Sequence, residues 1–375
     1  MNVGGITLCV LSLVQNLKQD FDVKVVAGPH ELNEGNAQTL ADELCVEVQI
    51  IHEMQRPINL KQDYKAYKKL KQIIKEFKPD IVHTHAAKPG AVGRLAAYFS
   101  KVPVIVHTYH GHVFHSYFGK LKSQFYIQIE RFMAKLSSAL IAISPQQKLE
   151  LVNQFKISNK DKIQMVFNGL NLEKFNAPNK QQIGEAFRQQ WGVKNNEIAI
   201  GIIGRLAPIK NIGYFVNAIN QLKNRGVKNI KALIIGDGEE LKSLKAQVAA
   251  LQLENDVVFT SWVKNIEQAY AGLDIVTLCS KNEGTPTTII EAQAAGLAIA
   301  SVNVGGVADI VEAGETALLN NLDNFDNYVN NLKTLIEDKQ KRTEMGELAK
   351  NYAFVNFSIQ IHTEQVKQLY AHLLG

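Results

Sequence analysis

Two glutamates stand eight residues apart in the string SKNEGTPTTIIEAQAAG at 280–296, directly after an apolar run. Thr285 can cap a helix and Pro286 suits its first turn, so the string predicts a strand, a loop and then a helix. Glu283 falls in the loop and Glu291 inside the helix. A carboxylate accepts two hydrogen bonds from a vicinal diol, as in a ribose or hexose, and the free N–H groups of a helix start bind phosphate. The string therefore predicts a nucleotide or sugar site, with acids that merely complement the helix dipole as the alternative.

A basic loop after another apolar run supplies cations. Gly204, Arg205 and Lys210 follow the run at 198–203. The glycine permits close backbone approach, and an arginine and a lysine five residues apart can neutralise a diphosphate leaving group without a metal. A Gly-Asp-Gly turn at 236–238 also follows an apolar run, and we interpret it as structural.

The elements that must position these residues follow one pattern. Short apolar runs rich in β-branched residues alternate with stretches of helical periodicity, which is typical of parallel sheets covered by helices. We therefore expect an α/β fold with two doubly wound domains, at 1–175 and 176–357, and a closing amphipathic helix at 358–375. The runs expected to be strands are 23–27, 46–51, 80–84, 102–108, 139–143, 163–167, 198–203, 231–235, 257–260, 274–278 and 297–302.

Length and composition exclude several classes of protein. The 375 residues are 46% hydrophobic and 21% charged, which excludes disorder, collagen and a disulfide-dense miniprotein. Cys9, Cys45 and Cys279 are far apart and lack CxxC spacing, so we expect no disulfide, no structural zinc and a reducing, cytosolic compartment. No apolar run reaches the roughly 18–20 residues that span a bilayer, and the run at 6–14 lacks the flanks of a signal peptide. At a membrane, the protein would lie on the surface.

Positive charge is concentrated in the first half of the chain. Residues 1–180 hold 23 Lys+Arg and 15 Asp+Glu, whereas residues 181–375 hold 18 and 21. A predicted helix at 60–77 has lysines over most of its surface, either as a solvated face or as a face attracted to anionic lipid or a lipid-linked pyrophosphate. The aromatic and basic segment at 111–122 is either buried or a membrane or acceptor contact. The apolar stripe of the helix comprises Leu60, Tyr64, Tyr67, Leu70, Ile74 and Phe77.

Taken together, these motifs resemble a known family. The loop at 204–210, the turn at 236–238, the pair Glu283 and Glu291, and the linker Asn168-Gly169-Leu170-Asn171…Phe175 are similar to those of the retaining glycosyltransferases of family 4, which have the two-domain GT-B fold. The segments 81–97 and 108–111 further resemble the bacterial subgroup that builds capsule, exopolysaccharide, O-antigen or N-glycan precursors on a polyprenyl diphosphate. The resemblance covers nearly the whole chain.

The resemblance implies a role for each matching residue. Arg205 and Lys210 would bind the donor diphosphate and stabilise the departing charge. Glu291 would hold the ribose hydroxyls, Glu283 the hydroxyls of the transferred sugar, and His110 would face that sugar beside the acceptor. Further donor contacts would come from Gly5, Gly204, Trp262, Val263, Gly284, Thr285 and Thr287.

The expected mechanism is a same-face substitution. A retaining hydrolase needs a carboxylate nucleophile, but the two glutamates are assigned to hydroxyls and no other acid stands out. The departing diphosphate oxygen would then take the proton of the incoming hydroxyl. We expect no metal and no cofactor, because the Asp-Phe-Asp string at 20–22 is interpreted as a turn and the histidines lack zinc-hydrolase spacing. These histidines are His83, His85, His107, His110, His112 and His115.

The expected function is transfer of a hexose or N-acetylhexosamine from a UDP-sugar to a polyprenyl-diphosphate-linked saccharide for a surface polysaccharide such as capsule or lipopolysaccharide. The enzyme would be peripheral at the cytoplasmic face of the membrane, which its basic N-terminal domain would contact. A nucleic-acid partner is not expected, because the basic half lacks a recognition motif. A nucleotide-sugar epimerase or hydrolase and a non-catalytic nucleotide-sugar-binding subunit stay open as alternatives.

The start of the chain departs from the family pattern. Relatives carry a full strand before the turn at 2–5, which here follows Met1 directly. That strand is central in a doubly wound sheet. We therefore expect either a true start upstream or an N-terminal sheet that lacks its first strand.

Overall fold

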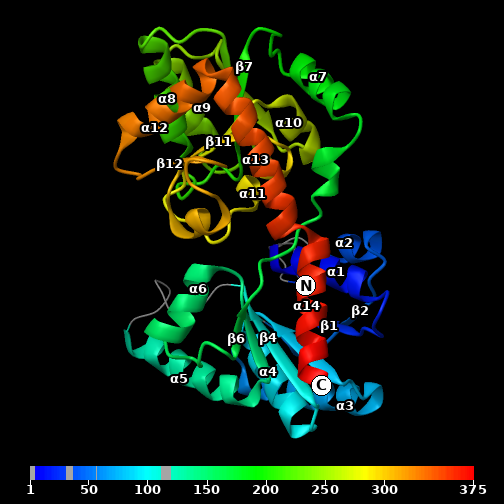
Figure 1. Ribbon diagram of the computed structural model, residues 1–375. Coiled ribbons are helices and arrows are strands. Elements are labelled where there is room, and N and C mark those ends of the chain that lie inside the picture. The colour runs from blue at the N-terminus through cyan, green and yellow to red at the C-terminus, as the bar shows by residue number, and fades with distance from the viewer. Residues whose placement is uncertain (1–4, 31–36, 56, 111–119) are drawn as a thin grey trace. The chain divides into compact units, whose positions relative to one another are not determined.

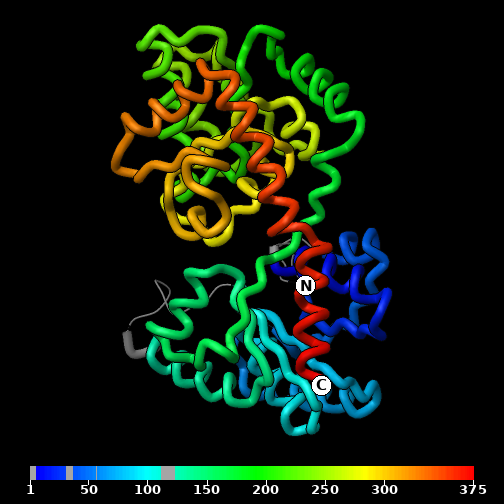
Figure 2. The backbone as a smooth tube through the Cα atoms, in the orientation of Figure 1, coloured from blue at the N-terminus to red at the C-terminus, as the bar shows by residue number. Residues whose placement is uncertain are grey.

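The computed structural model describes residues 5–30, 37–55, 57–110 and 120–375. The chain divides into two compact units, which can be followed as a ribbon in Figure 1 and as a tube in Figure 2. Unit 1 comprises Met1–Asn171 and Phe357–Gly375, and unit 2 comprises Leu172–Asn356. Both units contain parallel sheets flanked by helices, so the predicted α/β class is confirmed.

Unit 2 is built on one six-stranded parallel sheet with the order β12-β11-β10-β7-β8-β9. The first strand, β7, lies between β8 and β10, so the direction of winding reverses there. In open α/β sheets, ligands bind at this switch point, outside the carboxyl ends of the strands. The strands are β7 (Ile198–Ile203), β8 (Ile230–Ile235), β9 (Val257–Ser261), β10 (Ile275–Leu278), β11 (Ala298–Val302) and β12 (Leu318–Asn320).

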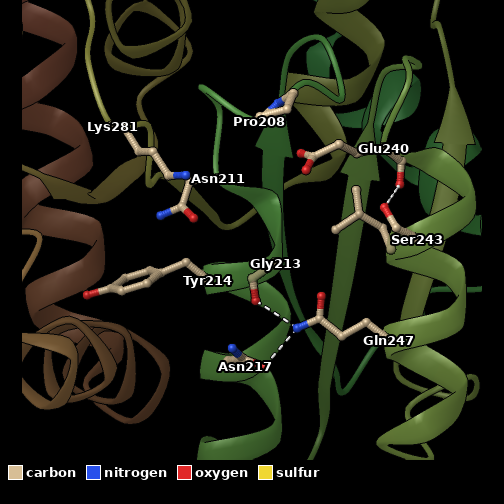
Figure 3. A pocket seen from close by; sticks show the side chains of 10 residues that line it. Pro208, Asn211, Gly213, Tyr214, Asn217, Glu240, Ser243, Gln247 and Lys281 are labelled. Atoms are coloured by element: carbon tan, nitrogen blue, oxygen red, sulfur yellow. Dashed lines mark hydrogen bonds between the residues drawn. The ribbon is translucent and has the colours of Figure 1, made fainter.

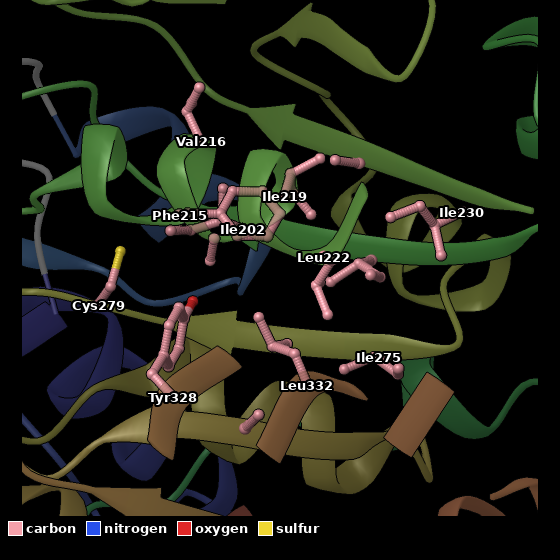
Figure 4. Close-up of a cluster of buried hydrophobic side chains, with 14 of the residues drawn as sticks. Ile202, Phe215, Val216, Ile219, Leu222, Ile230, Ile275, Cys279, Tyr328 and Leu332 are labelled. Atoms are coloured by element: carbon pink, nitrogen blue, oxygen red, sulfur yellow. The ribbon is translucent and has the colours of Figure 1, made fainter. Parts of the chain in front are cut away.

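The core of unit 2 lies between this sheet and helices that carry apolar stripes. Figure 4 shows part of it, where side chains of α8 and α12 gather beside the strands. The helical segments of the unit are η2 (Glu173–Asn176), α7 (Lys180–Gln190), α8 (Ile212–Asn224), α9 (Leu241–Ala250), α10 (Ile266–Gly272), α11 (Thr287–Ala294), η3 (Gly305–Ile310), α12 (Phe325–Glu337) and α13 (Lys339–Phe357).

Unit 1 contains two separate parallel sheets within its described residues. One has the order β3-β4-β5-β6 and the other pairs β1 with β2. The residues of β1 are half-buried and those of β3 mostly so, whereas every residue of β4 and β5 is buried. The strands are β1 (Val25–Ala27), β2 (Val48–Ile50), β3 (Ile81–His85), β4 (Val104–Tyr109), β5 (Ala139–Ala142) and β6 (Ile163–Met165).

The helices of unit 1 include the last one of the chain. Helix α14 packs against α1, and its Val366 and Tyr370 join the core formed by α1 and the four-stranded sheet. The helical segments are α1 (Gly5–Leu17), α2 (Gln38–Glu43), α3 (Leu60–Phe77), α4 (Ala87–Phe99), α5 (Lys120–Leu136), α6 (Pro145–Leu149), η1 (Glu150–Gln154) and α14 (Ile359–Leu374). None of the helices in the described ranges is both long and apolar enough to cross a membrane.

Helix α3 has the bounds that the sequence predicts, but its buried face differs. Leu60 and Tyr64, expected on the packed side, are 83% and 58% exposed. Their side chains belong to the first turns, whereas the packed stripe begins at Ala66 and continues through Ile74. The prediction was therefore wrong for these two residues.

The three cysteines are all free thiols. Cys9 and Cys279 are buried, whereas Cys45 is exposed. Burial raises the pKa of each buried thiol to about 12. Both buried thiols are therefore protonated near neutral pH.

Candidate functional site

The loops after β7 and β10 meet at the switch point of the unit 2 sheet. The Nζ atom of Lys210 donates a hydrogen bond to Oε1 of Glu283 at 2.7 Å. The main chains of the two loops are also joined, because the N–H of Lys281 donates to the carbonyl of Ile209 at 2.8 Å. The structure thus brings together a cation and a carboxylate that are 73 residues apart in the sequence.

Glu283 has a second donor on the same oxygen. The hydroxyl of Ser280 donates to Oε1 at 2.5 Å. The Glu283 side chain is 11% exposed and that of Lys210 is 31% exposed, so solvent still reaches the pair. A carboxylate has two acceptor oxygens and an ammonium has three N–H donors. Within the described ranges both bonds end on Oε1, which leaves Oε2 and the other ammonium hydrogens for a ligand.

Two glycines allow the backbones around the site to approach closely. Gly236 has a φ of +139°, and a Cβ there would lie 1.9 Å from the carbonyl oxygen of Gly204. Gly305 has a φ of +54°, and a Cβ there would lie 1.8 Å from the carbonyl oxygen of Glu283. Since neither space admits a side chain, backbone packs closely against each loop at one point, at Gly204 before Lys210 and at Glu283 itself.

Glu291 is anchored by a tyrosine. It lies in α11, and its Oε2 accepts a hydrogen bond from the hydroxyl of Tyr270 at 2.8 Å. Burial raises the pKa of the Glu291 carboxyl, while the Tyr270 hydroxyl and the nearby Lys174 ammonium act in the opposite direction. The carboxylate therefore depends on these two partners to stay charged in a partly desolvated position.

The start of α11 differs from the prediction. The helix begins at Thr287 with Pro286 at its N-cap, and no side chain caps it. Thr285 therefore lies before the helix and is not the cap, because the extended backbone of Pro286 delays the first turn. No side chain caps the N–H groups of the first turn, and uncapped N–H groups at a helix start can bind a phosphate.

The other predicted donor residues of unit 2 lie in loops. Arg205 is exposed, and within the described residues its guanidinium has no ion-pair partner. Gly284 accepts a hydrogen bond from the N–H of Gly306 at 3.0 Å. Beyond the end of β9, Trp262 is 62% exposed and Val263 is half-buried.

A cavity of about 380 Å³ lies beside this edge, and Figure 3 shows its lining. Its walls come from α8, with Tyr214 and Asn217, and from α9, with Gln247. The lining contains Asn211 and Lys281, which lie in the two loops, but none of the predicted donor-binding side chains. The candidate site is therefore the open edge of the sheet and not this cavity.

Unit 1 gathers histidines at the ends of β3 and β4. His85 Nδ1 lies 2.9 Å from His110 Nε2, and His83 lies between the hydroxyls of Tyr370 at 2.6 Å and Thr108 at 2.7 Å. Burial lowers the pKa of His83 to about 3 and that of His110 to about 4. These imidazoles are therefore neutral near pH 7.

The other expectations for unit 1 have mixed outcomes. Asp20 forms an ion pair with Lys367 and lies in the turn after α1, which supports the structural interpretation of the string at 20–22. Gly5 is the first residue of α1. The described ranges hold no group of three or more potential metal ligands. His112, His115 and most of the aromatic segment lie outside those ranges.

Three residues of the site were not predicted from the sequence. Tyr270 occupies an apolar position in a short helix, so nothing in its spacing distinguishes it from the core. Ser280 is the first residue of the quoted string, and its hydroxyl, three residues before Glu283, was a signal that could have identified it. Gly305 follows β11 and braces a loop that only the fold brings near.

Comparison with known families and proteins gives consistent matches. Residues 184–352 match the family model described as glycosyl transferases group 1, and residues 3–174 match that of glycosyltransferase family 4. A UDP-Gal:alpha-D-GlcNAc-diphosphoundecaprenol alpha-1,3-galactosyltransferase from Escherichia coli is 32% identical over 85% of this chain and 82% of its own length. The capsular polysaccharide biosynthesis glycosyltransferase CapM from Staphylococcus aureus is 26% identical over 84% of this chain and 83% of its own.

Solved structures with the same fold include two full-length matches. The Anabaena HepE protein in complex with UDP has a TM-score of 0.82 at 22% identity, covering 98% of this chain and 96% of that one. A glycosyltransferase from Rickettsia africae has a TM-score of 0.83 at 21% identity, covering 99% and 95%. The predicted GT-B fold is confirmed.

Proposed function

Since the chain belongs to glycosyltransferase family 4, and so transfers a sugar from a nucleotide sugar, we propose that its donor is a UDP-hexose or a UDP-N-acetylhexosamine. We further propose a polyprenyl-diphosphate-linked saccharide as the acceptor, for assembly of a surface polysaccharide. The relative from Escherichia coli, whose name specifies a UDP-sugar and a diphosphoundecaprenol acceptor, supports both choices. CapM supports the assignment to polysaccharide synthesis.

The contact between Lys210 and Glu283 carries this proposal. The bond that breaks joins the sugar to the diphosphate, so a group that binds the sugar and one that binds the diphosphate must be neighbours. At 2.7 Å the carboxylate and the ammonium satisfy that condition. We propose that Glu291, in the helix that follows, receives the ribose at the far end of the diphosphate.

The reaction we propose is a same-face substitution with retained configuration. The acceptor hydroxyl oxygen forms a bond to the anomeric carbon while the bond from that carbon to the diphosphate oxygen breaks. The hydroxyl proton passes to the departing oxygen. Arg205, Lys210 and the α11 N-terminus stabilise the charge that develops on the diphosphate, so we propose that no metal is needed.

Within this proposal, unit 2 binds the donor and unit 1 the acceptor. His110 lies in unit 1 and faces the transferred sugar as a neutral imidazole, because burial holds its pKa at about 4. A neutral imidazole can accept a hydrogen bond from a sugar hydroxyl or donate one to it. We also propose that the basic face of α3 lies against an anionic membrane at the cytoplasmic side, where the acceptor is held.

Calorimetric titration with UDP, GDP and ADP tests the proposal that the donor is a UDP-sugar. We expect selective binding of UDP, with the affinity reduced at least about 10-fold in Arg205→Ala and in Glu291→Ala. A matched control is Arg225→Ala, whose guanidinium pairs with Asp326 away from the site and should leave binding unchanged. A folded protein that binds none of the three nucleotides would contradict the assignment.

Product analysis tests the reaction. With a UDP-sugar and a lipid-diphosphate acceptor, we expect the anomeric configuration of the donor in the product by NMR, at a rate insensitive to a metal chelator. An inverted product would contradict the same-face mechanism. Donor turnover without acceptor would favour the hydrolase or epimerase alternative.

A further inference from the structure

Tyr270 is a polar residue enclosed in the core of unit 2. Its side chain is 0% exposed, and its ring packs edge-on against Phe175 with the centroids 5.2 Å apart. The hydroxyl lies 2.8 Å from Glu291 Oε2 and 3.2 Å from the carbonyl oxygen of Thr288. The hydroxyl has one proton for two acceptors, and the contact with the Glu291 carboxylate is the shorter of the two and the charged one.

The bond determines how Glu291 presents its second oxygen. The side chain has three rotatable bonds, and a carboxylate that is free to rotate loses entropy when a ligand orders it. One oxygen is held by Tyr270, which restricts the rotation of the carboxylate. An oriented acceptor favours bidentate binding of a vicinal diol.

We propose that Tyr270 is a positioning residue for nucleotide recognition, which orients the Glu291 carboxylate so that it accepts the 2′ and 3′ hydroxyls of the donor ribose. This inference rests on the proposed role of Glu291. Tyr270 does not touch the nucleotide, so it acts through Glu291 alone. Its hydroxyl contributes to the preference for ribose over a sugar without these hydroxyls.

A purely structural role makes a different prediction. A buried tyrosine hydroxyl usually has a hydrogen-bond partner, and losing it destabilises the fold whatever the ligand. In that case, binding of UDP and of 2′,3′-dideoxy-UDP would weaken together. The ratio of the two affinities separates positioning from stability, because both ligands share the base and the diphosphate.

The experiment measures this ratio for Tyr270→Phe by calorimetry. We expect the unaltered protein to prefer UDP and the variant to lose about 10-fold of that preference. Affinity for the dideoxy nucleotide should stay within a factor of two. The matched control is Tyr328→Phe, since Tyr328 is also 0% exposed in unit 2 and its hydroxyl bonds to Thr277 Oγ1 at 2.6 Å, not to Glu291. Its affinity ratio should be unchanged.

A second substitution keeps the test decisive if Tyr270→Phe does not fold. With 4-aminophenylalanine at position 270, the ring and an N–H donor are retained, so the preference for UDP should be retained. Loss of preference in this variant, or an unchanged ratio in Tyr270→Phe, would overturn the inference.

The outcomes also separate the inference from the proposed function. If Glu291→Ala abolishes the preference for UDP and Tyr270→Phe does not, the role of Tyr270 is wrong and that of Glu291 stands. If the unaltered protein binds UDP and its dideoxy analogue equally, the proposed role of Glu291 fails and the inference fails with it.

Discussion

Lys210 has an anionic partner within its own unit. Its ammonium contacts Glu283 at 2.7 Å, and the side chain keeps 31% of its surface exposed. In the reaction we propose, a diphosphate that binds this loop meets a cation that is oriented but still solvated on one side. Such a preorganised charge is worth more in a transition state than a freely mobile one.

We expect Lys210→Ala to reduce turnover by roughly 100-fold or more, because it removes one preorganised charge from the leaving group. The measurement is the initial rate of transfer at saturating donor. Lys223→Ala is the control, since Lys223 forms an ion pair with Asp256 at the surface of the same unit and should leave the rate unchanged. A normal rate in Lys210→Ala would refute its role at the leaving group.

At this scale the sequence predicts the charged residues better than their supports. Lys210 and Glu283 stand in recognisable strings. They come into contact because the loops that carry them follow adjacent parallel strands and so lie at the same edge of the sheet. Tyr270 has no such string. The role we propose for Tyr270 depends on the direction of one hydroxyl, which spacing along a helix cannot supply.

At the scale of elements, η3 supports the Glu283 loop through Gly305. We expect Gly305→Ala to impair UDP-sugar binding and lower the Tm, because its Cβ would meet the Glu283 carbonyl at 1.8 Å. Gly192→Ala is the control, since its φ of +66° carries the same backbone strain but nothing lies within 4 Å of its Cβ. That strain costs about 1–2 kcal/mol in either variant. Equal effects of the two substitutions on binding would show that the contact is unimportant.

Helix α3 presents lysines together with exposed apolar residues. Leu60 and Tyr64 are 83% and 58% exposed beside Lys61 and Lys65, and Ile58 just before the helix is 67% exposed. We expect the protein to float with anionic vesicles, and less so as salt rises, because mobile ions screen the attraction. Lys61→Glu with Lys65→Glu should abolish flotation, and Lys333→Glu in unit 2 should not. Flotation that ignores salt would contradict an electrostatic contact.

Element boundaries follow the sequence where periodicity is long. Helix α3 has the predicted bounds because its eighteen residues repeat the pattern many times. Strand β12, at the edge of the sheet, was not predicted, because only Ala317, Leu318 and Leu319 are apolar there and none of them is β-branched. Leu60 and Tyr64 are exposed because no other segment covers these two side chains within the described residues. The sequence of one helix does not determine which of its turns other segments cover.

At the scale of the whole molecule, all ten histidines lie in unit 1 and both tryptophans, Trp191 and Trp262, lie in unit 2. Burial lowers the pKa of His83 to about 3 and of His110 to about 4, and it moves His85 and His107 well below their usual range. The folded state therefore binds fewer protons than the unfolded state. Histidine protonation in acid should therefore lower the free energy of unfolding of unit 1, whereas unit 2 has no histidine to protonate.

The sign of the effect is fixed by these shifts. The stability due to neutral histidines is complete above the unfolded pKa of roughly 6.5 and is lost as pH falls toward 4, by up to about 1.4 kcal/mol per pH unit for each titrating group. At pH 5 we expect urea to unfold unit 1 first, so that far-UV circular dichroism changes before tryptophan fluorescence. His52→Gln, an exposed position, should leave this separation unchanged. Coincident transitions at pH 5 would contradict the prediction.

The distribution of thiols provides a way to follow the two units in solution. Maleimide dyes react with thiolates, so the exposed Cys45 of unit 1 should be labelled while the buried Cys9 and Cys279 stay intact. The tryptophans of unit 2 are natural fluorescence donors for such a dye. The chain labelled at Cys45 therefore carries fluorescence donors in unit 2 and a fluorescence acceptor in unit 1. The efficiency of energy transfer, measured with each nucleotide in turn, would report whether binding changes the distance between the dye and the tryptophans.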